Sequence, residues 1–126
     1  MPWPELVETE NGWSLPLAGL EVTRCSWQQA GVLLLLQGEG TGYFAEIGFS
    51  AHRHRSELLG AVVRDATVAR TGRLDIAFED GRAVTVEPNP SYEAWEVTAG
   101  TLKLVCLPGG GEPAIWDGTG SFEVTT

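Results

Sequence analysis

Apolar and polar residues alternate along most of this chain with a period of two, which is the pattern of half-buried β-strands. The clearest example is residues 73–78, RLDIAF, which are followed by EDG at 79–81 and by a second alternating run at 83–87. Asp-Gly is typical of a tight hairpin turn because it tolerates the positive φ that such turns require. By the same criteria we predict nine strands, at residues 20–27, 32–37, 43–49, 61–69, 73–78, 83–87, 94–99, 101–106 and 113–116. Residues 51–60 are compatible with one or two helical turns.

Two segments of the chain are similar to each other. Residues 17–40 align without a gap with residues 58–81, at an offset of 41 residues. The identical pairs are Leu17/Leu58, Gly19/Gly60, Val22/Val63, Gly31/Gly72, Leu33/Leu74 and Gly40/Gly81. We therefore predict a single all-β domain over residues 1–126 with little helix, built from two repeated three-stranded meanders. The meanders would pack as an antiparallel barrel or as a sandwich.

One strand is apolar on both faces. In the gapless alignment Leu34 and Leu36 take the places of Asp75 and Ala77, so the strand Val32–Leu36 needs a cover on its second face. The intramolecular candidate is the N-terminal segment, which carries four apolar side chains: Trp3, Leu6, Val7 and Trp13. The alternative is another subunit or a partner, which includes a homodimer through this strand, because large exposed apolar patches mark interfaces.

The chain is acidic, with 17 Asp and Glu against 8 Lys and Arg and a net charge of −9. The excess lies at both ends, since residues 1–23 hold four acids and no base, and residues 83–126 hold six acids and one lysine. Such a field repels a phosphate backbone and speeds encounter with a basic protein, so we expect a basic partner and no nucleic acid. Without an apolar run of membrane-spanning length or a basic signal region, we expect no membrane insertion and a cytoplasmic location.

The stretch PNPSYEAWEV, residues 88–97, concentrates aromatic and acidic side chains after the second meander. It has two interpretations. In the first, Trp95 plugs one end of the core and Tyr92 packs across a corner of the fold. In the second, four residues form a surface that binds a ligand or a basic partner: Tyr92, Glu93, Trp95 and Glu96.

Patterns for catalysis are weak in this stretch and in the glycine-rich loop that follows it. Glu93 and Glu96 lie three residues apart, so on a strand they point to opposite faces and cannot act as a glycosidase pair. Residues 108–113, PGGGEP, lack the Lys-Ser/Thr and the helix of a phosphate-binding loop, so we predict a flexible connection.

The remaining metal and nucleophile candidates are equally weak. His52 and His54 offer only two ligands and lie beside arginines, which disfavours a cation. Cys25 and Cys106 fall in apolar strands, where thiols are inert. We therefore predict no enzyme activity, no metal and no cofactor.

Four sequence elements carry a resemblance to a known family. They are L-x-G-x-x-V at Leu58–Val63, G-x-L-x-I-x-F-x-D-G-x-x-V-x-V at Gly72–Val86, YEAWE at Tyr92–Glu96 and PGGG-x-x-x-x-W at Pro108–Trp116. With these elements the chain resembles small bacterial proteins, largely actinobacterial, that share a domain of unknown function. The resemblance covers nearly the full length and implies no activity or catalytic residue.

Several functions are compatible with these features. The one we favour is a non-enzymatic protein-binding module, such as an acidic inhibitor or immunity protein against a basic partner. The second is a small-ligand-binding β-barrel whose pocket is lined by four aromatic residues: Trp27, Tyr43, Trp95 and Trp116. The others are a hydrolase with Glu93 or Glu96 as its base and a structural β domain.

Overall fold

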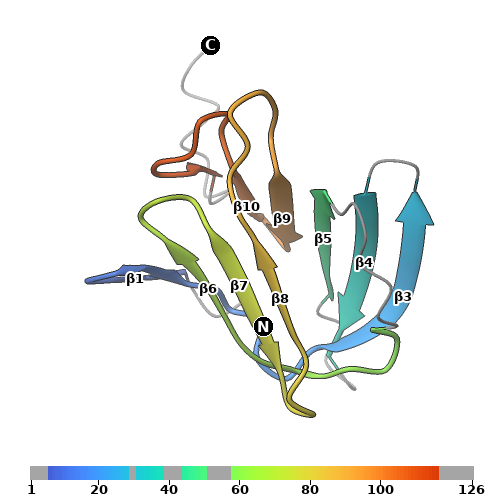
Figure 1. Cartoon of the computed structure of the whole chain (residues 1–126). Helices are drawn as coiled ribbons and strands as arrows, with labels where there is room; N and C mark the ends of the chain where they lie inside the picture. The colour runs from blue at the N-terminus through green and yellow to red at the C-terminus, as the bar shows by residue number, and fades with distance from the viewer. Residues whose placement is uncertain (1–5, 29–30, 39–43, 51–57, 117–126) are drawn as a thin grey trace.

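The computed structural model describes residues 6–28, 31–38, 44–50 and 58–116, which form strands and no helix (Figure 1). The five-stranded sheet has the order β1 (Val7–Thr9), β2 (Gly12–Ser14), β6 (Val63–Ala69), β7 (Leu74–Phe78) and β8 (Ala83–Val86). The six-stranded sheet has the order β11 (Ala114–Trp116), β10 (Leu102–Val105), β9 (Trp95–Ala99), β5 (Phe44–Ser50), β4 (Gly31–Gln37) and β3 (Glu21–Gln28). Neighbouring strands in both sheets are antiparallel.

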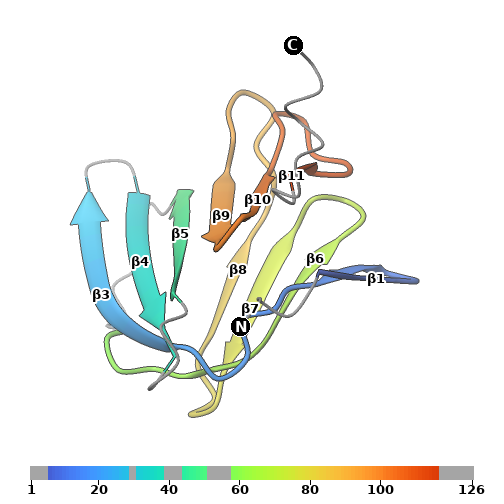
Figure 2. The ribbon, with the colours of Figure 1, turned by 180° about the vertical axis from the view of Figure 1, so that it is seen from behind.

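The two sheets face each other across one hydrophobic core, as in a sandwich (Figures 1 and 2). Alternate residues of the strands point inward, so burial follows the period of two that the sequence shows. The all-β antiparallel prediction is confirmed, as a sandwich and not as a closed barrel. The nine predicted strands correspond to β3–β11, and the hairpin of β1 and β2 adds two short strands that the sequence analysis missed.

The connections that lead from β2 into β3 and from β5 into β6 both cross from one sheet to the other, and they contact each other at the bridge between Glu21 and Val62. The segments that lead into these strands make the same hydrogen bonds at positions 41 residues apart: Val22 N–H donates to the Ala61 oxygen at 2.8 Å, and Val63 N–H donates to the Leu20 oxygen at 2.9 Å. Both segments turn at a glycine of positive φ, Gly19 at 89° and Gly60 at 87°. The two segments thus share this local geometry, while the duplication of residues 17–40 and 58–81 stays a prediction.

The gapless alignment is one residue out of register in the second strand of each meander. Val22 pairs with Leu36, whereas Val63 pairs with Phe78, which lies 42 residues after Leu36. The buried residues of β4 are accordingly Val32, Leu34 and Leu36, matching the buried Leu74, Ile76 and Phe78 of β7. The prediction that Leu34 and Leu36 form the second face is therefore wrong, because a one-residue shift exchanges the two faces of a strand.

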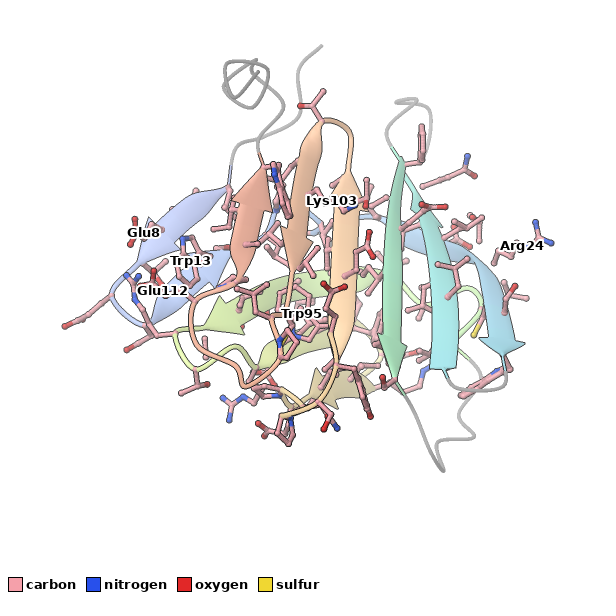
Figure 3. The ribbon with its side chains drawn as sticks, turned by 90° about the horizontal axis from the view of Figure 1, so that it is seen from above. Glu8, Trp13, Arg24, Trp95, Lys103 and Glu112 are labelled. Atoms are coloured by element: carbon pink, nitrogen blue, oxygen red, sulfur yellow. The ribbon has the colours of Figure 1, made fainter. Side chains whose placement is uncertain are left out.

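The outer face of β4 instead presents Leu33 and Leu35, both half-buried. The N-terminal segment does not cover them, because β2 pairs with β6 and β1 pairs with β2, so both strands extend the edge of the other sheet. Figure 3 shows Trp13 at the opposite side of the molecule from Arg24 of β3. Intramolecular cover by this segment is therefore wrong as far as residues 6–14 are concerned, and Trp3 lies outside the described residues. A homodimer through Val32–Leu36 stays a prediction.

The predicted helical turns at 51–60 fall mostly on residues 51–57, which lie outside the described part of the chain. Residues 58–60, which are described, are not helical. No helix among the described residues is long and apolar enough to span a membrane.

Candidate functional site

Trp95 lies at the centre of the corner that the sequence analysis singled out. Its side chain is only 1% exposed, and its Nε1–H donates to the carbonyl oxygen of Gly72 at 2.8 Å. Gly72 has a φ of 99° and forms part of the turn between β6 and β7. The Cys106 thiol, also buried, lies 3.6 Å from the same oxygen. Trp95 therefore plugs the core as the first interpretation states, and its one polar atom is satisfied there.

The glycine-rich loop packs against this corner. Gly111 N–H donates to the Thr71 oxygen and Gly109 N–H donates to the Asn89 oxygen, both at 2.8 Å. A Cβ added to Gly110 would lie 2.7 Å from the Thr71 oxygen, so only glycine allows this close approach. The loop that was predicted to be a flexible connection is thus tied to two other turns, because its glycines let backbone meet backbone.

Arg70 joins this loop to the N-terminal hairpin through Glu112 and Glu8. Figure 3 shows Glu8, Trp13 and Glu112 on the same side of the molecule. Its guanidinium lies 2.8 Å from a Glu8 oxygen and 3.5 Å from a Glu112 oxygen, and 4.7 Å from the centre of the Trp13 ring. A further hydrogen bond, at 2.8 Å, goes to the Thr9 carbonyl. These acids are exposed, so each pair stabilises by no more than about 1 kcal/mol. The cluster is best explained as a structural clamp.

A hollow of about 310 Å³ lies on the six-stranded sheet beside the same corner. Its lining residues come from β4, β5 and the start of β9: Gly31, Val32, Leu33, Gly48, Phe49, Ser50, Glu93, Ala94, Trp95 and Glu96. Three of the four predicted site residues are among them, while Tyr92 is not and is 39% exposed. The structure thus brings Glu93 and Glu96 to one hollow, with Trp95 beneath it in the core. A binding role for these residues stays a prediction.

The expectation that Glu93 and Glu96 point to opposite faces stays a prediction. It assumed a strand through both residues, but β9 begins only at Trp95. The alternation of a strand therefore does not apply to Glu93. Both glutamates are exposed and line the hollow.

The floor of the hollow is Gly48, in the middle of β5. It pairs with Leu33 on one side and with Glu96 on the other, so these three residues form one row across the sheet. Because Gly48 has no side chain, a gap is left in this row between the side chains of Leu33 and Glu96. The sequence analysis missed Gly48, although an isolated glycine inside an alternating strand pattern was the available signal.

The hollow offers mainly oxygen acceptors. Glu96 has an ion pair with Lys103 at 3.1 Å, in which both side chains are about half exposed. Glu93 has no ion pair among the residues that the structure describes. The Ser50 hydroxyl can also accept, and Leu33 supplies an apolar wall. This set suits a group with several donors and a positive charge.

The aromatic residues that were predicted to line a small-ligand pocket do not come together. Trp27 lies on β3 and Trp116 on β11, at the two opposite edges of the six-stranded sheet. Both are more than 40% exposed, whereas Trp95 is buried. Tyr43, like His52 and His54, lies outside the described residues. In the ranges that are described, no three His, Cys, Asp or Glu side chains are grouped for a metal ion.

Cys106 gives a testable pH dependence. Burial raises the pKa of its thiol, and the charge of Glu93 acts in the same direction, against a backbone hydrogen bond at Ala94. Above about pH 8.5, the pKa of an unfolded cysteine, the unfolded chain loses a proton that the folded chain keeps. The free energy of unfolding of the wild type should therefore fall as the pH rises above this value. The free energy of unfolding of the Cys106→Ala variant should fall less steeply over the same range. Urea unfolding between pH 7 and 10 measures this, and identical slopes would contradict it.

The matched family covers the corner and most of the hollow. The sequence profile of a family described as Family of unknown function (DUF6188) matches residues 45–117, more than half of the chain. The chain belongs to this family. The DUF6188 match spans β6–β11 and most of β5, with Gly48, Trp95 and the glycine-rich loop, but not β3 or β4. No curated protein and no solved structure matches the chain. The predicted relationship to a family of unknown function is confirmed, and its bacterial origin stays a prediction.

Proposed function

We propose that this DUF6188 protein is a non-enzymatic protein-binding module that contacts a basic partner protein through the hollow beside Glu93 and Glu96. An inhibitor or immunity protein is one form that such a module takes. The observation that carries the proposal is that two glutamates line one hollow on the outer face of a sheet. The net charge of −9 would add long-range attraction to a basic protein.

Tyr92 and Trp95 contribute in different ways. In this proposal Tyr92, which is 39% exposed and directly precedes Glu93 in the chain, contacts the partner. Trp95 has no exposed area for such a contact, and its hydrogen bond to Gly72 holds the start of β9 in place. In this proposal Trp95 positions the two glutamates and does not touch the partner.

Site-specific crosslinking tests where the partner binds. A photoreactive benzophenone amino acid at position 92 should capture a basic protein in cells of the native host, and the same probe at the exposed Val7 of the other sheet should not. The captured protein is then produced pure. Equal capture from both positions would contradict the proposal.

Calorimetry with the purified partner tests the chemistry. The double variant Glu93→Gln/Glu96→Gln should bind about tenfold more weakly at low salt, because close charge pairs at an interface contribute more than exposed pairs within one chain. Raising the salt should weaken the wild type more than this variant. The control is Glu46→Gln, which removes an exposed charge from β5 outside the hollow. A double variant that binds like the wild type would overturn the proposal.

A further inference from the structure

Gly48 is not explained by the fold. The fold does explain two other glycines in the described strands, Gly12 and Gly31. A Cβ at Gly12 would lie 1.9 Å from the Val68 oxygen, and a Cβ at Gly31 would lie 2.5 Å from the Phe49 oxygen. Among the described residues, a Cβ at Gly48 would meet only the Leu33 Cδ1, at an ordinary 3.9 Å. Gly48 also has no positive φ and no bulge in its pairing with either neighbouring strand.

A glycine inside a strand weakens the strand, and where it is not at a bend or bulge it marks a close approach by something else. The described chain puts no atom other than Leu33 Cδ1 within 4 Å of the missing Cβ. The space above Gly48 is instead the hollow between Leu33 and Glu96. A group that approached Gly48 closely would therefore come from outside the described residues.

We infer that the hollow over Gly48 receives an arginine side chain of the partner, an inference that rests on the proposed function. The aliphatic part would lie on Leu33 and on the bare backbone of Gly48. The guanidinium would reach the carboxylates of Glu93 and Glu96. Arginine is favoured at interfaces because its stem packs on apolar surface while its planar head bonds carboxylates in a bidentate way.

The donors and acceptors of the hollow favour arginine over lysine. The indole N–H of Trp95 is committed to Gly72, so it cannot serve an occupant. Among the described residues, the other side-chain polar groups that line the hollow are the two carboxylates and the Ser50 hydroxyl, and the carboxylates only accept. A guanidinium has five donors in a fixed plane, whereas an ammonium has three on a flexible stem. The ion pair between Glu96 and Lys103 is exposed and weak, so the Glu96 carboxylate can also bind the guanidinium of a partner.

The test is an NMR titration of the full chain with blocked amino acids. Nα-acetyl-L-arginine methylamide should shift the amide signals of Gly48, Ser50 and Glu96, with a Kd on the order of millimolar, as expected for a fragment-sized ligand. The lysine counterpart should bind at least about threefold more weakly and the uncharged citrulline counterpart at least about tenfold more weakly. Equal affinity for lysine, or no shift at Gly48 with arginine, would overturn the inference.

Gly48→Val provides the structural control. Valine suits a strand and its Cβ meets no backbone of the described residues, so the variant should unfold at the same urea concentration as the wild type or at a higher one. It should nevertheless weaken arginine binding about tenfold, whereas Glu46→Gln should change it less than twofold. A Gly48→Val protein that binds arginine normally would overturn the inference.

The outcomes for the two proposals are distinguishable. A partner that depends on Glu93 and Glu96 but is insensitive to Gly48→Val would support the proposed function and overturn the arginine site. Arginine shifts at Gly48 without a crosslinked basic protein at position 92 would support the site and overturn the proposed function.

Discussion

Trp95→Ala should lower the free energy of unfolding by about 3–5 kcal/mol, the range for deleting a buried tryptophan. Trp95 is 1% exposed, and its ring fills the core where β9 begins. Its removal also leaves the Gly72 carbonyl oxygen without the 2.8 Å hydrogen bond from Nε1. Urea unfolding followed by far-UV circular dichroism measures the change.

Two further variants separate the causes. Trp95→Phe keeps most of the apolar area and loses the hydrogen bond, so it should cost about 1–3 kcal/mol, the cost of an unsatisfied buried acceptor. Trp116→Ala removes a tryptophan that is 41% exposed, and it should cost less than about 1 kcal/mol. If Trp95→Ala and Trp116→Ala had equal effects, Trp95 would not be the plug of this corner.

Gly72→Ala should be the second most damaging change. The φ of 99° is unfavourable for any residue with a Cβ, which costs about 1–2 kcal/mol. The new Cβ would also lie 3.0 Å from the Gly111 oxygen and 3.3 Å from the Gly110 Cα, and displacing the loop should add about 1–3 kcal/mol, as overpacking does. The same unfolding assay measures the sum.

Gly81→Ala is the matched control for this prediction. Gly81 has a nearly equal φ of 94°, but a Cβ there would meet no atom of the described residues within 4 Å. Gly81→Ala should therefore lower the free energy of unfolding only by the cost of the positive φ, about 1–2 kcal/mol. The difference between the two variants isolates the contact with the glycine-rich loop. If both variants lost the same free energy, the loop would not be packed against this turn in solution.

These two predictions address one corner, where three elements of the family resemblance meet. The YEAWE element supplies Trp95, the meander supplies Gly72, and the PGGG element supplies the loop that packs against Gly72. The stretch at 88–97 therefore serves the fold through Trp95. In our proposal it serves binding through Glu93 and Glu96, which line the neighbouring hollow.

The limits of the sequence are clearest in β4 and in the site. The alternation of apolar residues in β4 correctly indicated a strand at residues 32–37. Which of its leucines point inward depended on a one-residue difference in register between the β3–β4 pair and the β6–β7 pair. Glu93 and Glu96 were recognised as candidates, yet their separation in sequence suggested that they diverge. β9 begins only at Trp95, so strand alternation does not extend to Glu93. Strand ends depend on pairing, here with β5 and β10, which is long-range.

An antiparallel all-β protein with nine strands, which correspond to β3–β11, could be predicted before any coordinates, because the period of two and the turn glycines are local properties of the chain. Tertiary structure alone decided that the sheets form a sandwich, that β1 and β2 extend the five-stranded sheet, and that Gly48 lies at the floor of a hollow. The reason is that sheet order, register and cavities arise from contacts between residues distant in the chain, such as Gly48 with Glu96 and Trp95 with Gly72.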